Sequence, residues 1–213
     1  MTVTVSAITA TGDGANVRLF VVLSDGEHRD KRELLVLASR FASLGVAKGE
    51  IDEATFSRLE KEAELCDAVR RGVSTLSYGP CSERQLAYKL RHKGISEAMA
   101  RAAVRTLVQM GYIDEASDTV RLAERGVAKQ WGQRRIAAEL LQKGYREAYV
   151  KAAVNALDEE LILGNCEALI ASRYGTAIDD PCDRKKAFSA LVRLGYSVSQ
   201  IQEAYARFKQ ENI

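Results

Sequence analysis

The first 30 residues alternate between apolar and other side chains with a period close to two, which is the pattern of β-strands that bury one face. The apolar positions of the two runs are Val3, Val5, Ile8, Val17, Leu19, Val21 and Leu23. Between the runs lies segment 11–16, whose Gly, Asp and Asn residues are typical of a turn. The pattern therefore predicts a β-hairpin, followed by a short third strand near residues 27–30.

From Lys31 the apolar spacing changes to that of a helix. The residues on the predicted apolar face are Leu34, Leu35, Ala38, Phe41 and Ala42. Segment 44–49 contains two glycines and is expected to end this helix, because glycine readily adopts the left-handed conformation past a helix C-terminus. A second, longer helix is predicted over residues 53–78.

The most informative pattern is an internal repeat. When residues 84–107 are compared with residues 134–157, eleven of 24 positions are identical, including the pairs Lys93-Gly94 and Lys143-Gly144. A more divergent third copy follows at an offset of 51 residues, with Leu194-Gly195 at the place of Lys143-Gly144. Terminal repeats usually diverge in this way because they cap the stack.

Each copy has room for three helices, and the middle one ends at a Lys-Gly or Leu-Gly stop. Ser82 and Ser96 are expected to cap the N-termini of two of the helices. The predicted first helices span 59–78, 115–130 and 164–175, the middle helices 82–93, 133–143 and 183–194, and the third helices 96–110, 146–159 and 197–211.

The predicted fold is therefore mainly α. Three tandem three-helix repeats, each resembling a helix-turn-helix, are expected to form an elongated, curved stack behind a small N-terminal β-hairpin and helix region. The expected boundaries are 1–57 for the N-terminal region and 58–113, 114–160 and 161–213 for repeats 1, 2 and 3.

Composition argues for a cytoplasmic protein. No apolar run approaches the roughly 18 residues that a membrane span needs, and the N-terminus lacks the basic and apolar regions of a signal peptide. The four cysteines, Cys66, Cys81, Cys166 and Cys182, form no CxxC pair, so reduced structural thiols are expected and a metal site is not.

The sequence contains none of the motifs that would indicate catalysis. It has no glycine-rich phosphate loop, no GxSxG and no HExxH motif. The two histidines, His28 and His92, are far apart in the sequence, which disfavours a Ser–His or Cys–His dyad. We therefore expect a protein that is not an enzyme and that needs no cofactor.

Charge is unevenly distributed, although the net charge is only +2. Residues 81–151 carry 14 Lys/Arg and 8 Asp/Glu, a net charge of +6, and are the expected face for an anionic partner. The alternative is a solvated helical surface rich in arginine. The candidate partner- or DNA-binding residues are Arg84, Lys89, Arg91, Lys93, Arg134, Arg135, Lys143, Arg146, Lys185 and Lys186.

A helix-turn-helix reading of the repeats suggests a second function. Such a protein would bind naked DNA with a helix in the major groove. The low net charge of +2 argues against this function, and no residue is identifiable as a reader of base edges. A protein-binding scaffold with another kind of partner is a third possibility on composition alone.

The repeat motifs resemble those of the RecX family. The resemblance rests on Ser82-x-x-Gln85-Leu86-x3-Leu90-x-x-Lys93-Gly94-Ile95, on Gly111-Tyr112-Ile113-Asp114, and on Gly132-x-x-Arg135-Ile136-x3-Leu140-x-x-Lys143-Gly144-Tyr145. It covers about residues 30–210. The chain departs from the family pattern at Tyr78-Gly79-Pro80-Cys81, where a basic approach is common, and at 115–118, where an aromatic residue is missing.

The resemblance implies a cytoplasmic regulator of the RecA recombinase. It implies binding within the helical groove of the RecA–DNA filament, with contact to single- or double-stranded DNA that is weak outside the filament. The usual consequence is inhibition of ATP hydrolysis, strand exchange and co-protease activity. We expect the net-positive section to face the filament and the protein to act as a monomer, because the sequence has no evident long exposed apolar face.

Overall fold

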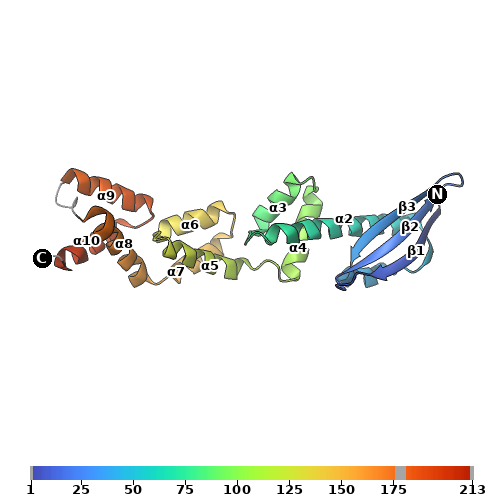
Figure 1. Cartoon of the computed structure of the whole chain (residues 1–213), viewed down its shortest axis with the longest axis horizontal. Helices are drawn as coiled ribbons and strands as arrows, with labels where there is room; N and C mark the ends of the chain where they lie inside the picture. The colour runs from blue at the N-terminus through green and yellow to red at the C-terminus, as the bar shows by residue number, and fades with distance from the viewer. Residues whose placement is uncertain (1, 176–180, 212–213) are drawn as a thin grey trace. The chain divides into compact units, whose positions relative to one another are not determined.

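The computed structural model of the chain describes residues 2–175 and 181–211. It divides into two compact units (Figure 1). The first comprises Met1–Pro80 and Leu86–Tyr112, and the second comprises Cys81–Gln85 and Ile113–Ile213. None of the helices among the described residues is both long enough and apolar enough to cross a membrane.

The first unit begins with an antiparallel sheet of strand order β3-β2-β1-β4. The strands are β1 (Thr2–Ala10), β2 (Asn16–Ser24), β3 (Arg29–Leu37) and β4 (Gly49–Ile51). The predicted hairpin is confirmed. Its turn is closed by a 2.9 Å hydrogen bond from the Thr11 amide to the Asn16 carbonyl oxygen. The β4 strand was not predicted.

A β-bulge at Ser6 explains the irregular apolar spacing of β1. The register with β2 shifts between Val5 and Ala7, and the Ser6 hydroxyl donates to the Phe20 carbonyl oxygen at 3.0 Å. The extra residue lets Val5 and Ile8, three positions apart, pack against the same core cluster. The two-residue period of a regular strand would place them on opposite faces.

The prediction of a helix from Lys31 is wrong, because residues 29–37 form β3. This strand pairs with β2 over its whole length, and its N-terminal half is a charged, exposed edge. Partly buried Leu34 and buried Val36, two positions apart, lie against the core. Only α1 (Ala38–Phe41) and the 3₁₀ helix η1 (Ala42–Leu44) are helical in this region, and they end at Gly45, whose φ is +63°.

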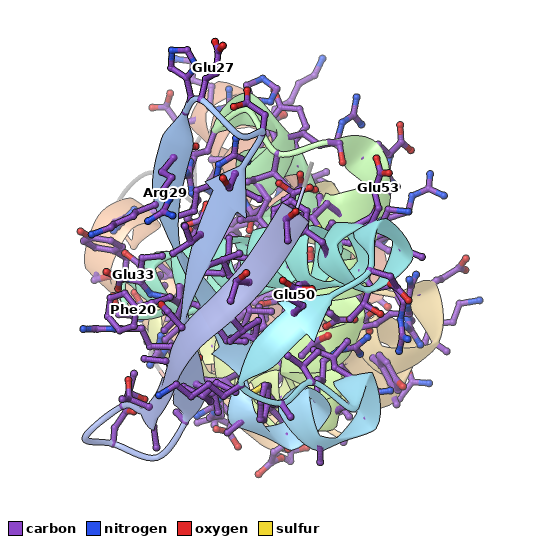
Figure 2. The ribbon with its side chains drawn as sticks, turned by 90° about the vertical axis from the view of Figure 1, so that its right-hand side faces the viewer. Phe20, Glu27, Arg29, Glu33, Glu50 and Glu53 are labelled. Atoms are coloured by element: carbon purple, nitrogen blue, oxygen red, sulfur yellow. The ribbon has the colours of Figure 1, made fainter. Side chains whose placement is uncertain are left out.

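Helix α2 (Glu53–Leu76) packs against β3 and buries Phe56 and Leu59 in the core of the sheet. Asp52 caps it by accepting a hydrogen bond from the Thr55 amide at 2.6 Å. The other face of the sheet is open: Phe20 and Glu33 are cross-strand neighbours and lie side by side at its surface (Figure 2). The rest of the first unit is most of α3 (Glu83–His92) and α4 (Glu97–Gln109), which packs on α2.

Both predicted serine N-caps are observed. The Ser82 hydroxyl accepts a hydrogen bond from the Gln85 amide at 3.1 Å, and the Ser96 hydroxyl accepts one from the Met99 amide at 3.3 Å.

The second unit is helical. Its helices are α5 (Glu115–Ala128), α6 (Gln133–Gln142), α7 (Glu147–Asn155), α8 (Glu159–Tyr174), α9 (Pro181–Arg193) and α10 (Val198–Glu211). Helix α5 packs on α7, and α8 packs on α10. Helix α8 begins five residues earlier than predicted because Asp158 caps it, accepting hydrogen bonds from the amides of Glu160 and Leu161.

The start of α6 and the end of α9 meet in a backbone contact, which we call the second joint. The Gly132 amide donates to the Leu194 carbonyl oxygen at 2.8 Å, and the Arg134 amide donates to the Gly195 carbonyl oxygen at 3.1 Å. The Tyr196 hydroxyl adds a 2.9 Å hydrogen bond to the Gln130 carbonyl oxygen. The two free amides of a helix start therefore meet the free carbonyls of a helix end.

A similar contact, the first joint, links the start of α3 to the end of α6. The Ser82 hydroxyl donates to the Lys143 carbonyl oxygen at 2.6 Å. Ser82 and Gly132 are 50 residues apart, and Lys143 and Leu194 are 51 residues apart, so the two joints involve positions that are equivalent in the internal repeat. The part of α3 that belongs to the second unit therefore meets the end of α6 at positions equivalent to those where α6 meets the end of α9.

Replacing Gly132 with alanine is expected to destabilise the second unit by about 1–3 kcal/mol. A Cβ at this position would lie 2.3 Å from the Gly195 carbonyl carbon, so the backbone of the second joint must move apart. The measurement is the free energy of unfolding from urea denaturation followed by circular dichroism.

Gly164→Ala is the matched control. Gly164 lies inside α8 of the same unit, and a Cβ there would meet no atom within 4 Å. This change should stabilise the protein by about 0.5–1 kcal/mol, because alanine loses less backbone entropy than glycine in a helix. Equal effects of the two substitutions would mean that the second joint is not formed.

Candidate polyanion-binding site

Four of the ten predicted cations are engaged in contacts within the protein. Lys93 donates to the Thr75 hydroxyl at 2.9 Å, and Lys186 pairs with Asp183 at 3.0 Å. The Arg135 guanidinium lies over the Trp131 ring, 4.4 Å from its centroid. Arg146 is the fourth. These contacts give the four residues structural roles that the sequence did not indicate.

Arg146 holds together two carboxylates from different helices. Its guanidinium donates to Glu83 of α3 at 2.6 Å and lies 3.6 Å from Glu115 of α5. The Glu115 side chain is only 3% exposed and also accepts the Glu83 amide at 2.8 Å. A buried carboxylate needs such compensation, so Arg146 stabilises the start of α3 on α5.

Three of the remaining cations form what we call the cation row: Arg84, Arg134 and Lys185. The 50- and 51-residue shifts of the internal repeat superimpose them, and they lie on the middle helices α3, α6 and α9. All three belong to the second unit and are exposed. No carboxylate of the described residues lies within 4.0 Å of any of them, so their charge is available to a ligand.

The two joints hold the backbone that carries two members of this row, Arg84 and Arg134. The Arg134 amide is itself a donor in the second joint. In the first joint the Arg84 side chain lies 3.3 Å from the position that a Cβ on Gly144 would occupy. The positive φ of Gly144, +81°, and the absence of its side chain therefore leave the space that Arg84 uses.

The other three predicted cations lie apart from the row. Lys143 is exposed at the first joint. Lys89 and Arg91 lie on the portion of α3 that belongs to the first unit, together with an unpredicted contact between the rings of Tyr88 and His92, whose centroids are 4.1 Å apart. This ring contact could have been predicted from the sequence, because residues four positions apart in a helix, such as Tyr88 and His92, lie on the same face.

Among proteins of known sequence, the regulatory protein RecX of Xanthomonas campestris pv. campestris (strain B100) is 30% identical over 147 residues, which cover 68% of this chain and 88% of that protein. This chain belongs to the RecX family. The regulatory protein RecX of Stenotrophomonas maltophilia (strain R551-3) is 28% identical over 137 residues, 64% of this chain and 83% of its own. No family profile matches the chain.

Solved RecX structures share the fold. The crystal structure of a regulatory protein RecX matches with a TM-score of 0.77 at 20% identity, covering 98% of this chain and 99% of that chain. RecX from Lactobacillus salivarius matches with a TM-score of 0.64 at 16% identity, covering 69% of this chain and 97% of its own. The mainly helical fold with a small N-terminal sheet is therefore a RecX fold.

The Gly-Tyr-Ile-Asp motif that resembles the family joins α4 to α5. Gly111, with a φ of +76°, ends α4, and the Tyr112 amide donates back to the Leu107 carbonyl oxygen at 2.9 Å. Ile113 is buried. Asp114 caps α5 by accepting hydrogen bonds from the hydroxyl and the amide of Ser117. The motif is thus a helix stop followed directly by a helix start.

The thiols that the structure describes are buried. Burial raises the pKa of Cys66 to about 11 and that of Cys166 to about 12, which makes both poor nucleophiles at neutral pH. Cys81 is buried as well, whereas the side chain of Cys182 lies outside the described residues. Within the described part of the chain, no three metal-ligating side chains come together.

The stabilisation that the Asp114 cap contributes is expected to depend on pH. Hydrogen bonds from the side chain and the backbone of Ser117 lower the pKa of Asp114 below its ordinary value of 3.8. The stabilisation is therefore complete above the unfolded-state pKa and is lost as the pH falls through the lowered, folded-state pKa. Asp114→Ala should melt at a lower temperature than the wild type at pH 7, and the difference should shrink as the pH falls toward and below that value.

Ser96→Ala is the control for this prediction, because it also removes an N-cap but one that does not titrate. Its deficit in melting temperature should persist at every pH where both proteins fold. Parallel pH dependence of the two variants would show that the Asp114 carboxylate is not the cap.

Proposed function

We propose that this protein regulates the RecA recombinase by binding the RecA–DNA filament in its helical groove, and that it inhibits ATP hydrolysis, strand exchange and co-protease activity. Membership of the RecX family supports the regulatory role. The observation that carries the contact is the cation row, in which Arg84, Arg134 and Lys185 are exposed and have no carboxylate partner among the described residues.

A row of this kind suits a polyanion with a regular repeat, such as the phosphate backbone of DNA in the filament. One exposed cation at equivalent positions of successive copies can contact phosphates spaced along a strand without reading bases. Because the joints fix the backbone that carries Arg84 and Arg134, that backbone needs little ordering on binding, which limits this part of the entropic cost. The three copies act in this proposal as three tandem repeats.

Inhibition follows if the protein spans adjacent filament subunits. A ligand that binds one inter-subunit geometry holds the filament in that state, and it occupies the groove that a second duplex must enter. We propose that the protein does this as a monomer in the cytoplasm.

The rival function, reading of naked DNA by a helix-turn-helix, has less support. The third helix of each motif would carry base contacts, yet a cation of both α4 and α7 is paired with a carboxylate one turn away, which leaves Arg105 of α4 without such a pair among the described residues. In α4 Arg101 pairs with Glu97, and in α7 Lys151 pairs with Glu147 at 2.9 Å. The cations without such partners that occupy equivalent positions of the repeat lie on the middle helices instead.

The direct test is the rate of ATP hydrolysis by RecA on single-stranded DNA while this protein is titrated in. We expect the rate to fall at well below one molecule per recombinase protomer, because one bound molecule affects several subunits. An unchanged rate, together with tight and sequence-selective binding to naked duplex, would overturn the proposal in favour of the DNA-binding regulator.

The triple variant Arg84→Glu, Arg134→Glu, Lys185→Glu tests the cation row. Filament affinity should fall about tenfold or more, since three exposed contacts of about 0.5–1 kcal/mol each are lost and repulsion is added. The dependence of the logarithm of affinity on the logarithm of salt should weaken by about two, at about 0.7 per phosphate contact on a single strand. Arg135 is left unchanged because its contact with Trp131 is structural.

The control is Arg105→Glu, Arg125→Glu, Arg173→Glu, which changes the net charge equally. These three arginines are exposed, make no ion pair with the described residues and lie outside the row. Both variants are first checked by thermal melting. Equal losses of affinity in the two would mean that only total charge matters and that the row is not a site.

A further inference from the structure

The last helical region of the chain has two hollows that share Phe188 of α9 as a lining residue. The first, of about 570 Å³, lies among α8, α9 and α10 and is lined by Ile170, Arg184, Phe188, Leu191, Ile201 and Tyr205, among others. The second, of about 680 Å³, is lined by Lys185, Lys186, Phe188, Ser189, Val192 and Arg193. Lys185, Phe188 and Ser189 line both hollows, which we together call the α9 groove.

The α9 groove combines an apolar floor with basic lining residues. Its floor is aliphatic and aromatic, with Ile170, Leu191 and Ile201 from three different helices. Its basic lining residues are Arg184, Lys185, Arg193 and Lys186, and of these Lys186 is already paired with Asp183. None of the described residues that line either hollow is a carboxylate.

We infer that the α9 groove docks a short segment of a partner protein in which aliphatic or aromatic side chains are flanked by aspartate or glutamate. The apolar floor would bury the hydrophobic side chains, and the cations at the rim would pair with the carboxylates. A hollow of about 570 Å³ has the volume of a typical ligand pocket, which holds two or three large apolar side chains. This inference does not depend on the proposed function.

A nucleic acid fits the groove less well than a peptide does. Stacking of a base needs an open aromatic face, and the ammonium group of Lys209 lies over the Tyr205 ring, 5.2 Å from its centroid. The remaining floor of the first hollow is aliphatic apart from Phe188. Aliphatic floors recognise apolar side chains rather than bases.

The experiment is selection of binders from a random 12-residue peptide library on the full-length wild-type protein, without RecA or DNA. Enriched peptides should combine Asp or Glu with Leu, Ile or Phe, and their affinities are then measured by fluorescence anisotropy. Failure of the proposed function would leave this assay unaffected, because it contains neither the recombinase nor its DNA.

Ser189→Trp fills the groove and should lower the affinity of the enriched peptides at least about tenfold. Ser172→Trp in α8 is its matched control, because each serine is exposed and its hydroxyl donates to the carbonyl four residues earlier, at 2.8 Å for Ser189 and 2.7 Å for Ser172. The control should bind like the wild type.

A second pair of variants tests the same groove if Ser189→Trp does not fold. Gln202, which is exposed, lines the first hollow. Gln202→Glu should weaken peptide binding about two- to fivefold, and Gln202→Lys should strengthen it by a similar factor, because each adds one exposed charge at the rim.

Four outcomes would overturn the inference. They are enrichment of no peptide, enrichment of peptides without acidic residues, displacement of the peptide by a single-stranded oligonucleotide even when Lys185, which the groove shares with the cation row, is replaced by alanine, and concentration-dependent dimerisation that Ser189→Trp abolishes. The third would assign the groove to nucleic acid, and the fourth would assign it to a second copy of this chain.

Discussion

The second unit depends on one recurring constraint, the contact between the start of one middle helix and the end of the next. At the second joint, amides that have no partner within α6 meet carbonyls at the end of α9 that need one. Gly132 and Gly195 make this approach possible, because a Cβ on either residue would lie within 2.5 Å of the facing backbone. The first joint meets the same requirement differently, with the hydroxyl of Ser82 as the donor to the Lys143 carbonyl.

The joints connect packing to function. They fix the backbone on which Arg84 and Arg134 stand, and Gly144 leaves the space that the Arg84 side chain uses. Other cations of the same region are needed elsewhere: Arg146 compensates the buried Glu115, and Arg135 covers Trp131. The basic residues in the middle of the chain thus fall into two groups. One group stabilises the fold, and the other is exposed and can contact a polyanion. Only the second group supports the proposed contact with the filament.

Much of the fold could be predicted from the sequence because its signals are local. The Lys-Gly and Leu-Gly stops, the Ser82 and Ser96 caps and the apolar periodicity located the helices to within a few residues. A third strand was predicted only near residues 27–30, and the rest of β3 was predicted to be helical. The strand's stability comes from pairing with β2, a non-local interaction, and its charged edge hides the two-residue period. The site was predicted less well. Sequence identifies every cation, but the carboxylate or ring that neutralises it, such as Glu83 for Arg146 over 63 positions, is visible only in three dimensions. The α9 groove left no sequence signal, since its residues come from three helices.

Hydrogen exchange at individual amides is the most direct test of the joints. The amides of a helix start usually exchange quickly because they have no partner within the helix. At the start of α6, however, the Gly132 and Arg134 amides donate across the second joint, whereas the start of α7, at Arg146, has no side-chain cap. We predict that Gly132 and Arg134 exchange as slowly as the interior amides of α6, while Glu147 and Ala148 of α7 exchange fast. Fast exchange at all four would contradict the account, because the middle helices would then not be held together at this joint and the cation row would lose its fixed placement.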